Sequence, residues 1–156
     1  MNKNEKILYI ILLISSNLFS QNITSYAFTN LVRKDVRYVE KYLASMDWKE
    51  IKTEDVNVLK YYYKNSSEQV QLNANIEIQF NKNEKISSFK MQIENPKIFE
   101  NYITQLKSNK HIKLVEKNNT KYQFISTDLL YEFILFKESN EKRVVYFVIA
   151  NRLEKD

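Results

Sequence analysis

The 156-residue chain contains no glycine and no cysteine, and it has one proline and one histidine. Without glycine it can form neither the Gly-rich phosphate loop of the P-loop proteins nor the Rossmann fingerprint. Without cysteine it can form no disulfide and no zinc site of the usual cysteine and histidine composition. We therefore expect no cofactor and no metal, and the stability of the fold must come from packing.

The single histidine, His111, stands in the segment NKHIKL with a lysine close on either side. Hydrolysis by a Ser–His–Asp or Cys–His arrangement needs a base beside the nucleophile. We expect His111 to be a surface residue at a strand end, and the protein not to be an enzyme. A carboxylate pair needs no histidine, cysteine or glycine, so a glycosidase using Glu77 and Glu132, each in mid-strand, is the catalytic alternative.

The composition is that of one folded domain. Hydrophobic residues make up 44% and aromatic residues 13% of the chain, which suffices for a core at this length. The formal net charge is +5, mostly from lysine. Because abundant Lys, Asn and Ile without glycine are typical of an AT-rich genome, this net charge alone is weak evidence for an anionic partner.

The N-terminal residues have the order of a secretory signal. MNKNEK is short and basic, ILYIILLI (7–14) is apolar, and SSNLFSQN adds small polar residues. We predict a signal peptide over 1–20, cleaved after Ser20. The apolar stretch is shorter than the roughly 20 residues that cross a bilayer. The expected product is an exported bacterial protein, periplasmic or secreted, not a lipoprotein and without stable membrane insertion after cleavage.

Hydrophobic periodicity predicts two amphipathic helices and eight strands. The first helix runs from Asn30, its N-cap, to Met46 and carries an apolar stripe. The second begins with Asn95 as cap and Pro96 in the first turn, and ends at Asn109. The stripe of the first helix consists of Val32, Val36, Val39, Leu43 and Met46. The predicted strands are 48–53, 57–64, 70–80, 85–93, 111–117, 120–127, 130–138 and 143–152.

The expected fold class is α+β, with both helices on one face of an antiparallel sheet in the order α-β4-α-β4. A single domain is expected over 21–156, with half-repeats at 30–94 and 95–153. A tandem duplication and a single layer without duplication both account for this order. The last three strands are apolar on both sides, so we expect them to be central or covered on both faces. The element order resembles that of β-lactamase inhibitory proteins, which depend on cysteines and glycines that this chain lacks.

With no glycine, the turn residues that need a left-handed backbone are expected to be asparagines. The asparagines at predicted turns are Asn65, Asn81, Asn83, Asn118, Asn119 and Asn140.

Aromatic side chains are the candidates for a binding surface. The segment KYYYK places three tyrosines in one strand, so Tyr61 and Tyr63 share a face and Tyr62 lies on the other. Tyrosine suits both a core edge and a binding surface, because its body is apolar and its tip is polar. Either two of the three tyrosines are core residues, or Tyr62 or the outward-facing pair forms a binding platform. The predicted binding residues are Trp48, Tyr61, Tyr62, Tyr63, Tyr122 and Tyr131.

The favoured function is a non-catalytic interaction module that binds a protein or cell-envelope component through the exposed sheet face. No nucleic-acid partner is expected for an exported protein. The alternative is a carrier that holds a small apolar ligand between sheet and helices, in a pocket lined by Phe133, Leu135, Phe147 and Ile149. A basic helix face could also contact anionic lipid or polysaccharide, although such faces are usually only solvated. This face consists of Arg33, Lys34, Arg37 and Lys41.

Overall fold

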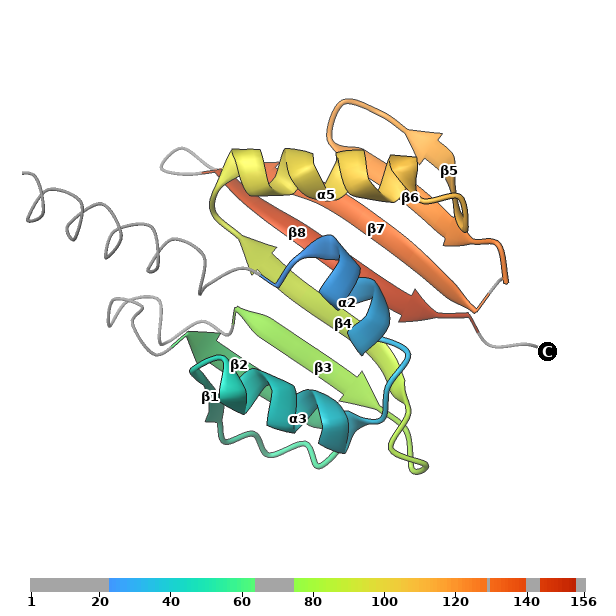
Figure 1. Ribbon diagram of the computed structural model, residues 1–156. Coiled ribbons are helices and arrows are strands. Elements are labelled where there is room, and N and C mark those ends of the chain that lie inside the picture. The colour runs from blue at the N-terminus through green and yellow to red at the C-terminus, as the bar shows by residue number, and fades with distance from the viewer. Residues whose placement is uncertain (1–22, 64–74, 129, 140–143, 154–156) are drawn as a thin grey trace, which may run out of the picture.

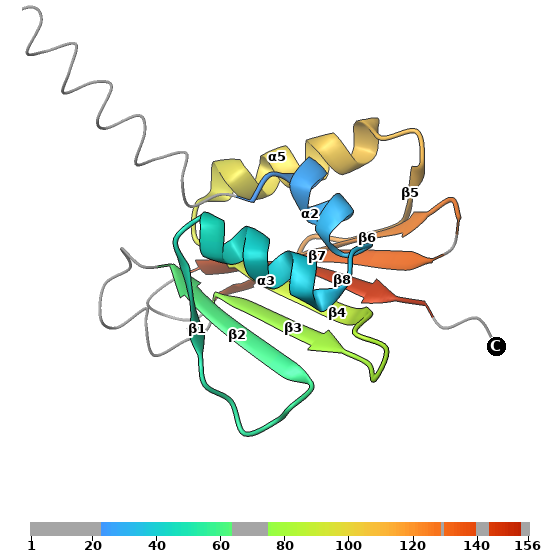
Figure 2. The ribbon, with the colours of Figure 1, turned by 60° about the horizontal axis from the view of Figure 1, so that its bottom comes forward.

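The computed structural model describes residues 23–63, 75–128, 130–139 and 144–153. They form a mixed fold of three helices and an open eight-stranded antiparallel sheet, with the helices on one face (Figures 1 and 2). The helices are α2 (Ser25–Leu31), α3 (Val36–Ser45) and α5 (Pro96–Ser108). The strands are β1 (Trp48–Ile51), β2 (Val58–Tyr63), β3 (Ile76–Phe80), β4 (Ile86–Ile93), β5 (Ile112–Lys117), β6 (Lys121–Ser126), β7 (Tyr131–Ser139) and β8 (Val144–Arg152).

The sheet consists of two meanders that meet at its centre. The strand order is β1-β2-β3-β4-β8-β7-β6-β5, and all neighbours are antiparallel. After β4 the chain crosses through α5 to the far edge, and the second meander returns until β8 pairs with β4. The two halves are thus related by an approximate two-fold rotation between β4 and β8. A tandem duplication stays a prediction, because this topology suits both accounts of the repeat.

The eight-stranded antiparallel sheet confirms the strand predictions, with bounds that differ by a few residues. The predicted strand 70–80 is described only from Ile76, and the predicted signal peptide lies outside the described residues. Of the three strands predicted to be central or doubly covered, β8 is central, whereas β6 is next to an edge. No described element covers their second side. None of the three described helices combines the length and apolarity needed to cross a membrane.

The predicted first helix, 30–46, is wrong in its bounds, because the chain forms two helices there. Asn30 lies inside α2, and the cap of α3 is Asp35, whose carboxylate accepts the backbone N–H of Tyr38 at 2.8 Å. The backbone N–H of Val36 donates to the carbonyl of Glu84 at 2.9 Å, so the β3–β4 turn also fixes the start of α3. Capping and this tertiary contact override a continuous apolar stripe.

The second helix confirms its prediction. Asn95 is the N-cap of α5 and its side chain accepts the backbone N–H of Lys97 at 3.0 Å. Pro96 takes the first turn, where its missing N–H has no intrahelical partner to lose, and Asn109 is the C-cap. The buried face of the helix consists of Phe99, Tyr102, Ile103 and Leu106.

The prediction that asparagines take the left-handed backbone is wrong for the described turns. The described residues with positive φ are Asp47 (62°) and Glu84 (59°). Asn81 and Asn118 instead use their side-chain oxygens to accept backbone N–H groups two to four residues ahead. Asn65 and Asn140 lie outside the described residues.

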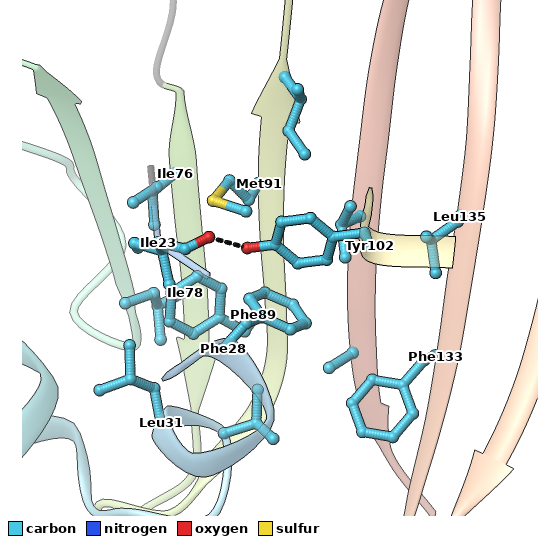
Figure 3. Close-up of a cluster of buried hydrophobic side chains, with 14 of the residues drawn as sticks. Ile23, Phe28, Leu31, Ile76, Ile78, Phe89, Met91, Tyr102, Phe133 and Leu135 are labelled. Carbon is cyan, nitrogen blue, oxygen red and sulfur yellow. Dashed lines mark hydrogen bonds between the residues drawn. The ribbon is translucent and has the colours of Figure 1, made fainter. Parts of the chain in front are cut away.

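The core lies between the sheet and the helices and joins both halves. Phe28 of α2 packs edge-on against Phe89 of β4, with ring centroids 5.0 Å apart, and also contacts the rings of Tyr102 and Phe133 (Figure 3). The buried Tyr102 hydroxyl donates to the carbonyl of Ile23. Burial raises the pKa of Tyr102, so the hydroxyl stays protonated and able to donate. α2 thus packs against core residues of both halves, which also meet where β4 pairs with β8.

Candidate functional site

The predicted aromatic residues do not form one surface. Four of them are buried beneath the helices, with exposed fractions of 3% to 5%, and two are half-buried. The half-buried pair lies on opposite faces, since Tyr62 alternates with buried Tyr61 and Tyr63, whereas Tyr122 is on the helix side in register with Leu135. The buried four are Trp48, Tyr61, Tyr63 and Tyr131.

The buried aromatic residues are surrounded as core residues are. The Trp48 ring packs edge-on against Tyr63, with centroids 5.6 Å apart. Burial raises the pKa of the Tyr61 hydroxyl, and the carboxylates of Glu40 and Glu50 raise it further. Of the predicted binding residues, therefore, Tyr62 alone lies on the sheet face that the helices leave open, hereafter the open face.

The carboxylates predicted for a glycosidase lie on the open face but on separated strands. Between β3, which carries Glu77, and β7, which carries Glu132, lie β4 and β8. Three strand spacings alone separate them by about 14 Å, beyond the roughly 5–9.5 Å of glycosidase pairs. Glu77 is paired with Lys60 (Oε2–Nζ 3.6 Å), and Glu132 accepts a hydrogen bond from the Gln123 amide. Their geometry is that of a polar sheet surface.

The other candidates are also dispersed. His111 is exposed just before β5. The side chains proposed to line a carrier pocket divide between two faces, since Phe133 and Leu135 are buried under the helices while Phe147 and Ile149 point the other way. No group of three or more metal-ligating side chains occurs among the described residues.

The basic helix face is partly neutralised. Arg33 pairs with Asp128 (Nη1–Oδ2 2.8 Å), and Arg37 pairs with Glu84 (Nη2–Oε1 2.6 Å). The Lys34 ammonium lies over the Tyr38 ring at 5.5 Å.

A different group of side chains stands out on the open face. Ile134 and Phe136 of β7 lie in register with Ile149 and Phe147 of β8, and all four are half-buried. The two phenyl rings stack, with centroids 5.0 Å apart and planes at 24°. We call these four residues the apolar strip. An antiparallel sheet with one covered face usually presents polar side chains on the other, so an apolar strip there requires its own explanation.

Charged groups border the apolar strip. The Lys90 ammonium of β4 lies over the Phe147 ring, 4.7 Å from its centroid. On the other side, Lys121 of β6 is in register with Phe136 and its ammonium binds Glu116 at 3.1 Å. The strip thus has an aromatic centre and polar flanks, which is the arrangement of many protein interfaces. The sequence carried the signal for it in the two-sided apolar strands 130–138 and 143–152.

Both edges of the sheet are poor places for a partner strand. β1 has four residues, and β5 has a register shift between Leu114 and Glu116 and carries lysines. Short strands, bulges and lysines are the features by which sheet edges resist pairing. The open face is therefore the better candidate for contact with a protein.

These features define an α+β protein with an open antiparallel sheet and an apolar strip on the face that no described element covers. Comparison of the chain with protein-family models, curated proteins and solved structures gives no match.

Proposed function

We propose that this is an exported, non-catalytic binding module that contacts a protein of the cell envelope through the apolar strip. The observation that carries the proposal is the stacked pair Phe136 and Phe147 on a sheet face that no described element covers. Half-exposed aromatic rings in a polar surround are favoured as the centre of a protein contact, because their burial removes much apolar area from water at little entropic cost.

Export is part of the proposal and rests on the N-terminal sequence. The predicted cleavage after Ser20 precedes Ile23, the first described core residue, whose exposed fraction is 1%. Cleavage there would leave the described core complete. Protein recovered from the envelope of the source organism is expected to begin at Gln21, and recovery with Met1 from the cytosol would contradict export.

The test of the contact is site-specific photo-crosslinking in the native envelope. A benzophenone side chain replaces Phe136 in one variant and Gln79 in the other; Gln79 is an exposed open-face residue of the N-terminal half. We expect the probe at 136 to give a discrete protein adduct that the probe at 79 does not give. A Phe147→Ser substitution added to the 136 variant should abolish it. Equal adducts at both positions, or none at 136, would contradict the proposed contact.

A further inference from the structure

The positive charge of the chain is concentrated at one end of the sheet. Residues 107–123 contain five lysines and one glutamate, a net charge of +4, against +5 for the entire chain. This stretch runs from the last turn of α5 through the hairpin of β5 and β6. With 20 lysines in 156 residues, an even distribution would place about two lysines in a stretch of this length. We call the exposed lysines among them the basic edge: Lys107, Lys110, Lys113 and Lys117.

Contacts bring two lysines of the basic edge together in space. The ammonium groups of Lys107, on α5, and Lys117, on β5, lie 5.3 Å and 5.6 Å from the centroid of one ring, that of Tyr122. The end of α5 and the β5–β6 hairpin are neighbours at this edge in both views (Figures 1 and 2). Tyr122 therefore brings two like charges from different elements to one place.

The two acidic side chains of residues 107–128 are paired with cations outside the basic edge. Glu116 binds Lys121 at 3.1 Å, and Asp128, which follows β6, binds Arg33 at 2.8 Å. The basic edge thus keeps its positive charge for a partner.

Two apolar side chains lie among these lysines. Leu114 and Val115 have exposed fractions of 41% and 53%, and the register of β5 shifts between Leu114 and Glu116. Such an irregularity gives the strand an extra residue and re-aims its side chains. Adjacent exposed aliphatic residues on a lysine-bearing edge have the composition of a surface that rests on a lipid interface.

We propose that the basic edge is a docking surface for a membrane that contains anionic phospholipid. Its lysines meet the headgroup phosphates, while Leu114 and Val115 enter the boundary between headgroups and acyl chains. A lipid surface is favoured over an added protein strand because the irregular, lysine-bearing β5 resists strand pairing. This surface is separate from the apolar strip and stands or falls independently of it.

The test is flotation of the chain from Gln21 onward, the exported form proposed above, with vesicles of phosphatidylcholine, alone or with about one third phosphatidylglycerol. Two triple variants remove equal charge: K110Q/K113Q/K117Q at the basic edge, and K49Q/K52Q/K82Q as the control among exposed lysines of the N-terminal half. The wild type and both variants begin at Gln21, so the apolar segment before it cannot hold any of them on the vesicles. Circular dichroism confirms that each variant is folded.

We expect the wild type to prefer the anionic vesicles and to lose binding in high salt. Each lysine near an anionic membrane raises the affinity about fivefold, so loss of three should make the basic-edge variant bind about a hundredfold more weakly. The affinity of the control variant should stay much closer to that of the wild type. A double variant, Leu114→Ser with Val115→Ser, should weaken vesicle binding even in low salt, where the attraction of the lysines is strongest, because it removes the apolar contact. Equal loss in the two triple variants, no preference for anionic vesicles, or capture of an acidic protein without vesicle binding would overturn the proposal.

Discussion

On the side that the helices cover, the two halves of the sheet are alike, and on the open face they differ. Under the helices, Ile78 and Phe89 of the first half and Phe133 and Leu135 of the second are all buried to 1% or less. On the open face, the first half presents mainly polar groups, such as the Lys60–Glu77 pair, and the second presents the apolar strip.

The charges of the halves differ as well. Residues 30–94 contain eleven basic and ten acidic residues, a net charge of +1, whereas 95–153 contain ten and six, a net charge of +4. Folding requires the helix side to be apolar in both halves, but it requires neither the strip nor the basic edge. A surface feature that only one of two similarly built halves carries is therefore the best candidate for binding. Both proposed surfaces lie in the second half.

The largest expected effect tests whether the halves share one core. Phe89→Ala in β4 and Phe133→Ala in β7 each remove a ring whose exposed fraction is 0% or 1%, and each ring packs against Phe28. We expect each variant to lose about 3–5 kcal/mol of unfolding free energy in urea, with a single transition whose slope is unchanged. Two separate transitions, one for each half, would show that the halves fold independently.

A smaller effect distinguishes the two halves of the open face. Phe147 and Gln92 are register partners across the seam between β8 and β4. Phe147→Ala removes a half-buried ring that stacks on Phe136 and lies under Lys90, so we expect a loss of about 1–2 kcal/mol of unfolding free energy. Gln92→Ala, the matched control, should change it by less than about 0.5 kcal/mol. Equal losses would mean that the strip has no distinct packing.

The difference between predicted and observed structure follows from the range of the forces involved. Strand alternation is local, and it placed Tyr61 and Tyr63 on one face and Tyr62 on the other. Which face the helices would cover depends on contacts between distant segments, so the burial of Trp48 and Tyr131 was not readable from their neighbours in sequence. The break before α3 depends on a bond from Val36 to Glu84, almost fifty residues away.

The sequence alone indicated part of the candidate surfaces. The two-sided apolar pattern of β7 and β8 signalled the strip, but assigning Phe147 and Ile149 to the open side required the sheet register. The left-handed backbone at Glu84 had no local signal, whereas Asp47 carried a weak one, because aspartate adopts that backbone more often than most residues other than glycine.

The smallest expected effect concerns the ion pair that joins the halves at the surface. The Ser126 hydroxyl, together with the Leu130 backbone N–H and the Arg33 guanidinium, holds the pKa of Asp128 below its usual range. A lowered folded-state pKa means that the ionised form stabilises the fold above the unfolded pKa of about 3.9, and that this contribution is lost as the pH falls through the folded value.

Because both partners are about 40% exposed (43% and 39%), Asp128→Asn should cost only about 0.5 kcal/mol at pH 7. Urea unfolding at pH 7 and at stepwise lower pH, down through the folded pKa of Asp128, measures how the difference between the two proteins changes as the carboxyl takes up its proton. The difference should shrink toward zero in acid, whereas Glu54→Gln, an exposed carboxylate of the first half, should show little effect at any pH. A difference that persists undiminished in acid would mean that Asp128 acts by shape and hydrogen bonding, and that its charge does not hold the halves together.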